Sequence, residues 1–306
     1  MKKILILGSE GFLGKHLVDY YLNIGFDVTG CDIVEAAVTK YKYFKISLLS
    51  SSISTIFTTS KYDYCINASG NGNVFFSVQH PYSDFESNVI SVSNVLENIR
   101  LYNVECKYLH ISSAAVYGNP IQIPVSETDD CKPVSPYGWN KLISEQVCKQ
   151  YQSQYGLKIL ITRPFSIYGP GLKKQLFWDT YQKSKIDNQA SISLWGTGNE
   201  SRDFIFVDDV VRCFDFLINE GNFNAEIYNI ATGIEISINH AVESFLKAIN
   251  CNKEMHFSNV QRQGDPVHWR ADISKITALG FQPKVEFENG IKSFAKWIQT
   301  TSINEY

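Results

Sequence analysis

The sequence lacks the features that would assign it to several common protein classes. No apolar stretch reaches the roughly 18 residues of a membrane-spanning helix, and the N-terminus starts with a strand-like run and not with a signal peptide. The formal net charge is −3 and long basic runs are missing. We therefore expect neither nucleic acid nor a membrane as a partner. Internal repeats and low-complexity tracts are missing as well.

The cysteines and histidines have no spacing that is typical of a disulfide scaffold or a metal site. The seven cysteines include no C-x-x-C pair; they are Cys31, Cys65, Cys106, Cys131, Cys148, Cys213 and Cys251. The isolated histidines are His80, His110, His240, His256 and His268. We therefore expect free thiols, a cytoplasmic location and no bound metal ion.

The first stretch of the chain combines a buried strand, a glycine-rich turn and a helix. Residues 4–7 form an unbroken apolar run, which is typical of a strand that is buried on both faces. Gly8 can then make the tight turn, Gly11 lets the backbone approach a pyrophosphate, and Gly14 lets the following helix pack closely. A helical pattern covers 11–24, so phosphates would lie at a helix N-terminus. This order favours dinucleotide binding over the alternative of an unspecific strand–helix turn.

Asp32 ends the next predicted strand, 27–32, and lies 18 residues beyond Gly14. A carboxylate there can accept hydrogen bonds from both adenosine ribose hydroxyls and would repel a 2′-phosphate. The spacing therefore favours NAD over NADP, and the alternative is an aspartate that only starts a turn. The loop 69–73 is rich in small residues, which lets the chain pass close to a cofactor.

The rest of the chain alternates strands and helices. Further strands are predicted near 43–46, 62–68, 107–113, 158–162, 205–207 and 227–230, and further helices at 84–102, 137–155, 208–219 and 237–249. This alternation predicts an α/β fold with a Rossmann-type doubly wound parallel sheet. We expect 1–170 to be mainly the NAD-binding domain, with segments near 203–232 returning to it. The remainder, 171–306, is expected to be mainly a smaller C-terminal α/β substrate-binding lobe.

Tyr137 and Lys141 lie four residues apart and share one face of the predicted helix 137–155. A positive neighbour favours the phenolate, so we expect the pKa of Tyr137 to fall from its usual value of about 10. Such a phenol can exchange a proton with a substrate hydroxyl during hydride transfer. The pair follows a strand that ends in Ser112 and Ser113, and a serine hydroxyl there can orient the reacting oxygen. Lys141 can also hydrogen-bond the nicotinamide ribose.

Taken together, these motifs resemble the extended short-chain dehydrogenases/reductases of the NAD-dependent nucleotide-sugar epimerase/dehydratase family, and UDP-glucose 4-epimerases among them. The resemblance covers about residues 2–298. Besides the glycines, Asp32 and the Tyr–Lys pair, it is carried by the stretches 112–118, 163–171, 196–204, 207–209, 262–266 and 270–272.

The resemblance implies a role for each matching residue. It implies catalysis by Ser113, Tyr137 and Lys141. It implies cofactor contacts at Gly8, Gly11, Phe12, Leu13, Gly14, Asp32, Ile33, Ala68, Ser69, Tyr137, Lys141, Pro164 and Ile167. It implies contacts to a nucleotide-diphosphate sugar at Asn73, Ser113, Ser166, Arg202, Arg262 and Asp265. It also implies a homodimer formed by a four-helix bundle of the helices near 84–102 and 137–155.

Three departures from the family pattern affect the substrate side. Ser166 stands where many members have an asparagine, and the stretch 67–73 replaces the usual His-x-Ala-Ala. Sugar 4,6-dehydratases show Thr-Asp-Glu where this chain has Ser113, Ala114 and Ala115. Because no acid/base pair for water elimination is evident, we place dehydration well below epimerisation.

Several residues keep two interpretations. Tyr117 either packs in the core or touches the substrate, and Arg202 and Arg262 either hold a diphosphate or form surface ion pairs. The aromatic residues with two interpretations, a base or sugar pocket and the core of the lobe, are Phe75, Phe76, Phe177, Trp178 and Trp195.

The favoured function is an NAD-dependent nucleotide-sugar epimerase that acts at C4 of the hexose through a transient 4-keto intermediate. The first alternative is an NAD(P)H-dependent reductase of a nucleotide-linked 4-keto-6-deoxyhexose, which would use the same residues and exchange its cofactor. A 4,6-dehydratase and a non-catalytic NAD-binding protein are the remaining alternatives.

Overall fold

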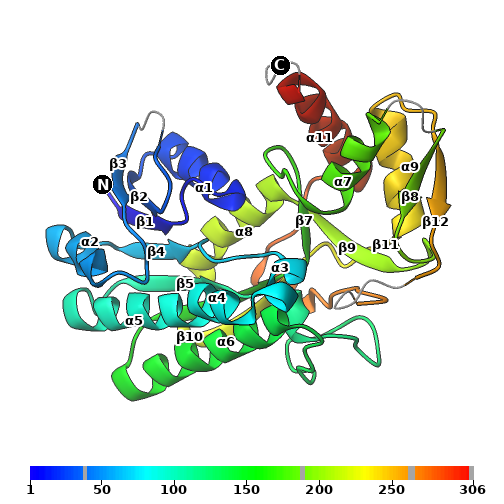
Figure 1. Cartoon of the computed structure of the whole chain (residues 1–306). Helices are drawn as coiled ribbons and strands as arrows, with labels where there is room; N and C mark the ends of the chain where they lie inside the picture. The colour runs from blue at the N-terminus through cyan, green and yellow to red at the C-terminus, as the bar shows by residue number, and fades with distance from the viewer. Residues whose placement is uncertain (37–39, 187–189, 261–265, 303–306) are drawn as a thin grey trace.

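A seven-stranded parallel sheet forms the centre of the computed structural model, which describes residues 1–36, 40–186, 190–260 and 266–302 (Figure 1). The strand order is β10-β6-β5-β4-β1-β2-β3, and all neighbours are parallel. The strands are β1 (Lys3–Leu7), β2 (Asp27–Asp32), β3 (Lys42–Lys45), β4 (Tyr64–Asn67), β5 (Lys107–Ile111), β6 (Ile159–Pro164) and β10 (Asn224–Ile230). The predicted Rossmann-type doubly wound sheet is confirmed.

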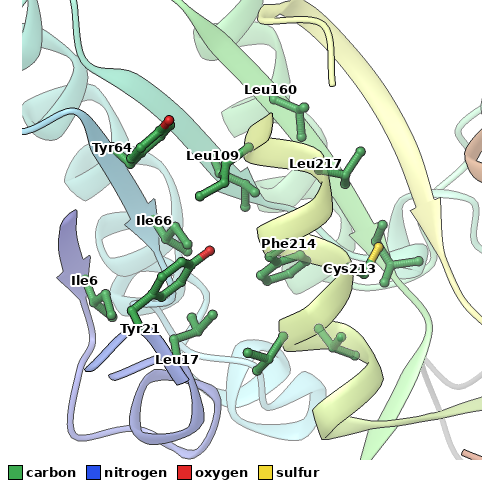
Figure 2. Close-up of a cluster of buried hydrophobic side chains, with 14 of the residues drawn as sticks. Ile6, Leu17, Tyr21, Tyr64, Ile66, Leu109, Leu160, Cys213, Phe214 and Leu217 are labelled. Carbon is green, nitrogen blue, oxygen red and sulfur yellow. The ribbon is translucent and has the colours of Figure 1, made fainter. Parts of the chain in front are cut away.

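Helices cover both faces of this sheet, and β1 contributes to two separate cores. Ile4 and Ile6 pack with α1 (Phe12–Asn23) and α8 (Val207–Glu220), and Figure 2 shows this cluster. Leu5 and Leu7 belong to the cluster on the other face, which includes side chains of α2 (Ser54–Thr59), α5 (Ser91–Tyr102) and α6 (Pro136–Tyr155). A slip of one residue would exchange the two faces. The apolar run therefore fixes the register of β1 and, with it, the place of the glycine turn.

The region predicted as one helix, 84–102, is interrupted. It consists of the end of α4 (Pro81–Phe85), a π-helical turn (Glu86–Ile90) and α5. The expected apolar stripe is buried; it comprises Val89, Val92, Val95, Leu96 and Ile99. The stripe begins with Val89 inside the turn and continues along α5 at ordinary helical spacing. The sequence pattern therefore did not reveal the interruption. The short helix α3 (Val74–Gln79) precedes α4.

The second lobe contains two small sheets and an aromatic core. One sheet has the order β11-β9-β7 and the other pairs β12 with β8. These strands are β7 (Ser166–Tyr168), β8 (Ser191–Leu194), β9 (Ser201–Phe206), β11 (Glu235–Ser237) and β12 (Glu254–Phe257). The remaining helices are α7 (Gln175–Ser184), α9 (Ile238–Ala248), α10 (Ser274–Leu279) and α11 (Phe287–Ser302). Tyr168, Phe177 and Phe294 are among the buried rings of this lobe.

Part of the chain after residue 170 lies with the main sheet. Helix α8 packs on one face and β10 adds to one edge, whereas β9 pairs with β7 and β11 in the small sheet. The boundaries of the two predicted domains stay a prediction. Among the described residues, no helix is long and apolar enough to cross a membrane, and no group of His, Cys, Asp or Glu side chains is arranged to hold a metal ion.

Candidate active site

The glycine turn lies against the backbone that follows β4. Gly8 has a φ of +76°, and a Cβ there would lie 2.7 Å from the backbone nitrogen of Ser69 and 2.8 Å from the carbonyl oxygen of Ala68. A Cβ on Gly14 would lie 1.9 Å from the Gly8 carbonyl oxygen. Gly11 precedes α1, and within the described residues no side chain caps this helix. Its first N–H groups are therefore available to a phosphate.

Asp32 at the end of β2 is tied to the same turn. Its Oδ2 accepts a hydrogen bond from the Glu10 N–H at 3.0 Å, and its Oδ1 accepts one from the Ile33 N–H at 2.7 Å. A carboxylate has about four lone-pair positions, so both oxygens can still accept from a ribose. The Ile33 side chain is exposed beside it. This arrangement suits the predicted contact to an adenosine ribose.

Phe12 and Leu13 contribute differently from the glycines. The Phe12 ring meets His16 edge-on at 5.5 Å and lies next to Gly171. Leu13 packs against the cores of both the main sheet and the second lobe. Both side chains pack where the main sheet meets the second lobe. We therefore expect Phe12 and Leu13 to contact the cofactor through their backbone N–H groups and not through their side chains.

The structure brings the three predicted catalytic residues together. Ser113 begins a short 3-10 turn (Ala114–Val116) after β5, and its hydroxyl is hydrogen-bonded to the Tyr137 phenol. The Lys141 Nζ lies 5.9 Å from the centre of the Tyr137 ring and donates to the Ile111 carbonyl oxygen at 3.0 Å. Their catalytic roles stay predictions.

Burial changes the pKa values of this pair, and it moves Tyr137 in the direction opposite to our expectation. Burial raises the pKa of Tyr137 to about 12; the hydrogen bond with Ser113 opposes this, whereas the charge of Asp84 adds to it. Burial lowers the pKa of Lys141 to about 8, against the charge of Asp84. The charge of the neighbouring lysine favours the phenolate, but desolvation disfavours the charged form of both groups and outweighs it here.

A chain of buried polar groups lies below the pair. The Asn67 amide donates to the Tyr108 hydroxyl at 2.9 Å, which lies 3.4 Å from His110 Nδ1, and His110 Nε2 lies 2.9 Å from Ser144 Oγ. Ser144 Oγ donates to the Lys141 carbonyl oxygen at 2.7 Å. His110 Nε2 must therefore be the donor to Ser144, which assigns a neutral imidazole with the proton on Nε2. Burial accordingly holds the pKa of His110 well below its usual value.

A buried salt bridge separates the roles of the two adjacent serines. Arg163 on β6 donates to both carboxylate oxygens of Glu145 on α6, at 2.9 and 2.7 Å. Ser112 Oγ donates to the same carboxylate, so Ser113 is the serine that meets the phenol. Tyr117 is buried, accepts from Arg163 at 2.9 Å and donates to Asn229 at 2.7 Å. Of its two interpretations, packing in the core describes Tyr117.

The predicted substrate residues lie in separate places. Ser166 on β7 and Arg202 on β9 belong to adjacent parallel strands, with Ser166 in register with Phe204. The Arg202 guanidinium donates to the Ser201 carbonyl oxygen at 2.8 Å and lies 5.7 Å from the Trp269 ring. Arg262 and Asp265 lie outside the described residues. The Asn73 side chain caps α3 by accepting from the Phe76 N–H at 3.1 Å.

Two of the predicted cofactor contacts, Pro164 and Ile167, lie where the main sheet meets the second lobe. Pro164 ends β6, in register with Ile230 on β10. Ile167 is partly buried on β7, where it packs against the cores of both regions. Of the aromatic residues with two interpretations, Phe177 lies in the core of the lobe and Trp178 packs against it. Phe75 and Trp195 are exposed, and their role in a pocket stays a prediction.

Two charged residues near the catalytic pair were missed by the sequence analysis. Asp84 is fully buried between α4 and α6. It stands on the same helical face as the apolar stripe, and a polar residue on a buried face was a usable signal. Lys174 lies across the loop after β4, where a Cβ on Gly72 would lie 3.5 Å from its Nζ. Nothing in the local sequence distinguished Lys174 from other lysines.

The comparisons with known proteins agree over most of the chain. The model of the "NAD dependent epimerase/dehydratase family" matches residues 4–231. A putative UDP-glucose 4-epimerase of Methanocaldococcus jannaschii is 29% identical, over 98% of this chain and 99% of the relative. A crystal structure of the Thermotoga maritima UDP-glucose 4-epimerase with UDP-glucose has a TM-score of 0.90 and 26% identity, and covers 98% and 99% of the two chains.

A Thermus thermophilus UDP-glucose 4-epimerase in complex with NAD has a TM-score of 0.88 and 25% identity, over 97% of this chain and 99% of that one. The predicted NAD cofactor is confirmed. The glycine turn, the open N-terminus of α1 and the Asp32 carboxylate suit its pyrophosphate and ribose. The chain belongs to the NAD dependent epimerase/dehydratase family.

Proposed function

We propose that this protein epimerises a nucleotide-diphosphate sugar at C4 through a transient 4-keto intermediate. The observation that carries the proposal is the joint placement of the Ser113–Tyr137–Lys141 group and the NAD cradle at the C-terminal ends of the parallel strands. Ligands bind at that edge in open α/β sheets. The named 4-epimerases among the relatives and solved structures support the same activity.

The residues of the chain divide the work of proton transfer. Bound NAD supplies the hydride acceptor and a positively charged ring. Tyr137 takes the proton of the sugar hydroxyl, and Ser113 orients that oxygen because it is already hydrogen-bonded to the phenol. Lys141 holds the nicotinamide ribose and places a positive charge one helical turn from Tyr137, which favours the phenolate that burial disfavours. Inversion at C4 would require the 4-keto sugar to present its other face, and Tyr137 would then return the proton to the sugar oxygen.

Lys174 supports a substrate that carries negative charge. Within the described residues its Nζ has neither a hydrogen bond nor an ion pair, and it lowers the pKa of Lys141. Solvent reaches the side chain, but the surrounding protein still lowers the pKa of its ammonium. The next residue, Gln175, has a φ of +67°, a conformation that costs a residue with a Cβ about 1–2 kcal/mol. An anionic substrate group would relieve the repulsion between Lys141 and Lys174.

The alternatives are less well supported. Ala114 and Ala115 occupy the turn that faces the phenol, so this turn provides no carboxylate for water elimination. A 4-keto-sugar reductase would use the same residues, and the names of the relatives favour epimerisation over reduction.

The test is incubation with a panel of UDP-, dTDP-, GDP- and CDP-sugars, with and without NADH, followed by NMR. We expect the purified protein to hold NAD in stoichiometric amount and to interconvert a pair of 4-epimers without added cofactor. Steady consumption of NADH with a 4-keto-6-deoxy sugar would contradict epimerisation and establish the reductase.

We also propose that the protein forms a homodimer through the outer faces of α5 and α6. Large apolar side chains are exposed on these helices and on the turn that precedes α5; they are Ile90 in the turn, Leu101 on α5, and Trp139, Ile143 and Tyr155 on α6. Light scattering should give twice the mass of one chain, and Trp139→Glu should shift the protein toward the monomer. A cytoplasmic location is proposed as well, because all seven cysteines are free; cell fractionation tests it.

A further inference from the structure

A buried carboxylate beside the catalytic pair has no place in the mechanism above. Asp84 is 0% exposed, and its oxygens accept hydrogen bonds from the side-chain amides of Asn140, at 2.7 Å, and Asn88, at 3.1 Å. Among the described residues its side chain has no other hydrogen-bond donor and no cation in contact. Glu145, the buried carboxylate on α6, is instead held by Arg163 through two hydrogen bonds. The charge of Glu145 is thus neutralised locally, and that of Asp84 is not.

The amide partners of Asp84 connect two parts of the site. Asn140 directly precedes Lys141 on α6. The Asn88 amide donates both to Asp84 and, at 3.1 Å, to the carbonyl oxygen of Asn71 in the loop 69–73. Gly70 of that loop lies so close that a Cβ would be 2.6 Å from Asn88 Oδ1. Asp84 therefore joins the loop beside the cofactor cradle to the helix that carries the proton-transfer residues.

The π-helical turn makes this connection possible. Asp84 lies in the last turn of α4, two residues before Glu86, where the π-helical turn begins, and Asn88 lies inside the turn. Both side chains are buried and reach α6 and the loop, whereas α5 buries Ser91 and its apolar stripe. Such turns are frequent at functional sites.

Asp84 and Lys141 act on each other electrostatically. Of the charges around Lys141, Asp84 does most to raise its pKa against burial. Burial raises the pKa of Asp84, and its two amide donors and the charge of Lys141 oppose that rise. The titratable groups that face Lys141 are Asp84 from α4, Tyr137, Glu145 and Cys148 from its own helix, His110 from β5 and Lys174 from the segment before α7. Asp84 is the anion among them that no nearby cation neutralises by contact.

We infer that Asp84 is a positioning residue for the catalytic pair: its carboxylate is the counter-charge that keeps Lys141 an ammonium, and its two amide partners fix α6 against the loop 69–73. Only the kinetic part of this inference rests on the proposed function. The stability part concerns the charge state of Lys141 in the protein alone.

The kinetic test is the pH profile of Asp84→Asn. This change keeps the size of the side chain, and rotation of the Asn140 amide restores its hydrogen bond. Without the counter-charge, Lys141 loses its proton at lower pH, so we expect the alkaline limb of kcat to move down by about one unit. Because the pKa of Lys141 is about 8 in the wild type and would be about 7 in the variant, turnover at pH 8 should fall about fivefold to sixfold, while turnover at pH 6 changes by less than about threefold. An unchanged limb, or a loss of turnover that is equal at every pH, would overturn the inference.

The second test measures thermal unfolding and needs no substrate. The folded-state pKa of Lys141 is about 8, below the value of about 10.4 in an unfolded chain. Between these values the unfolded state binds more protons, so the contribution of Lys141 to stability rises with pH. Lys141→Met, which has no ammonium, removes that rise. In Asp84→Asn we expect the rise to begin at lower pH than in the wild type, and an unchanged onset would overturn the inference.

Two further variants separate charge from structure. Glu86→Gln removes a negative charge two residues away, and we expect it to leave both pH profiles unchanged. The double variant Asp84→Asn, Asn140→Asp returns a carboxylate from the α6 side and should restore the wild-type limb. If Asp84→Asn does not fold, the double variant tests the inference in its place. A double variant whose alkaline limb of kcat differs from that of the wild type would overturn the inference. If the wild type epimerises no sugar of the panel, the proposed function fails while the unfolding test still applies.

Discussion

The cofactor side and the substrate side of the site are built in different ways. The cofactor side consists mainly of backbone: Gly8, Gly14 and the Ala68–Ser69 peptide lie so close together that there is no room for a Cβ. The proposed substrate side relies on side chains from distant segments, and the proposed contacts include Arg202 on β9 and Lys174 before α7. This difference implies that a fixed backbone can hold a cofactor that is common to a family. Substrate specificity can then change through substitution of single side chains.

Tyr137 lies where the two sides meet, and its loss should have the largest effect. Tyr137→Phe removes the proton acceptor and keeps the ring, so we expect turnover to fall by about 10²- to 10⁴-fold. The amount of NAD that co-purifies with the protein should stay the same, because the cradle is untouched. Unchanged turnover in the NMR assay would remove Tyr137 from the mechanism.

The next largest effect should come from a single methyl group on the cofactor side. Gly14→Ala places a Cβ 1.9 Å from the Gly8 carbonyl oxygen, so the turn must move. We expect the free energy of unfolding to fall by about 1–3 kcal/mol and the bound NAD to be lost on purification. Gly25→Ala is the control: a Cβ there meets nothing within 4 Å, and only its positive φ costs about 1–2 kcal/mol. If Gly14→Ala retains NAD, the close backbone packing at Gly8 and Gly14 is not what holds the cofactor.

On the substrate side, Arg202→Met should weaken substrate binding and leave the cofactor in place. A hydrogen bond to a charged group contributes about 1.5–3 kcal/mol, so KM should rise about tenfold to hundredfold while kcat changes little. Arg202→Lys keeps the charge but not the fork of donors, and should fall between the wild type and Arg202→Met. Steady-state kinetics with the substrate found in the sugar panel checks this, and an equal loss of bound NAD would contradict the division into two sides.

The smallest effect is expected for Lys174→Gln, because solvent partly screens this charge. We expect KM to rise about threefold to fivefold, with a greater rise for a sugar that carries a carboxylate if Lys174 meets the sugar and not the diphosphate. Lys185→Gln, which removes a charge from the other end of α7, is the control. Equal kinetics for the two variants would show that Lys174 does not contact the substrate.

Most of the sheet could be predicted because a parallel strand that is buried on both faces is a continuous apolar run. The bounds of β2 match the predicted 27–32, and β10 was expected in part. The π-helical turn and the pairing of β9 could not be predicted. The π-helical turn is defined by its backbone hydrogen bonds, which the sequence pattern does not show. The pairing of β9 depends on which of two sheets this short strand joins.

The candidate site was predictable in its parts and less so in its electrostatics. Glycine spacing and the Tyr–Lys pair identified residues that the structure brings together. The raised pKa of Tyr137 depends on how much protein surrounds the phenol, and the role of Asp84 depends on the helix that it faces. Such neighbours come from elsewhere in the chain and leave no trace in the spacing of local residues. Arg262 and Asp265, two of the predicted substrate residues, lie outside the described residues.

The adjacent serines after β5 set a limit on how this family member can change. Ser112 is committed to the salt bridge and Ser113 to the phenol, and extended backbone turns successive side chains to opposite sides. An insertion or deletion of one residue between β5 and this pair would exchange the two hydroxyls. One of the two serines would then take the place of the other, and either the salt bridge or the phenol would lose its hydroxyl partner. Length in this segment is therefore as strictly constrained as residue identity, and homologous strands should differ here by substitution and not by insertion.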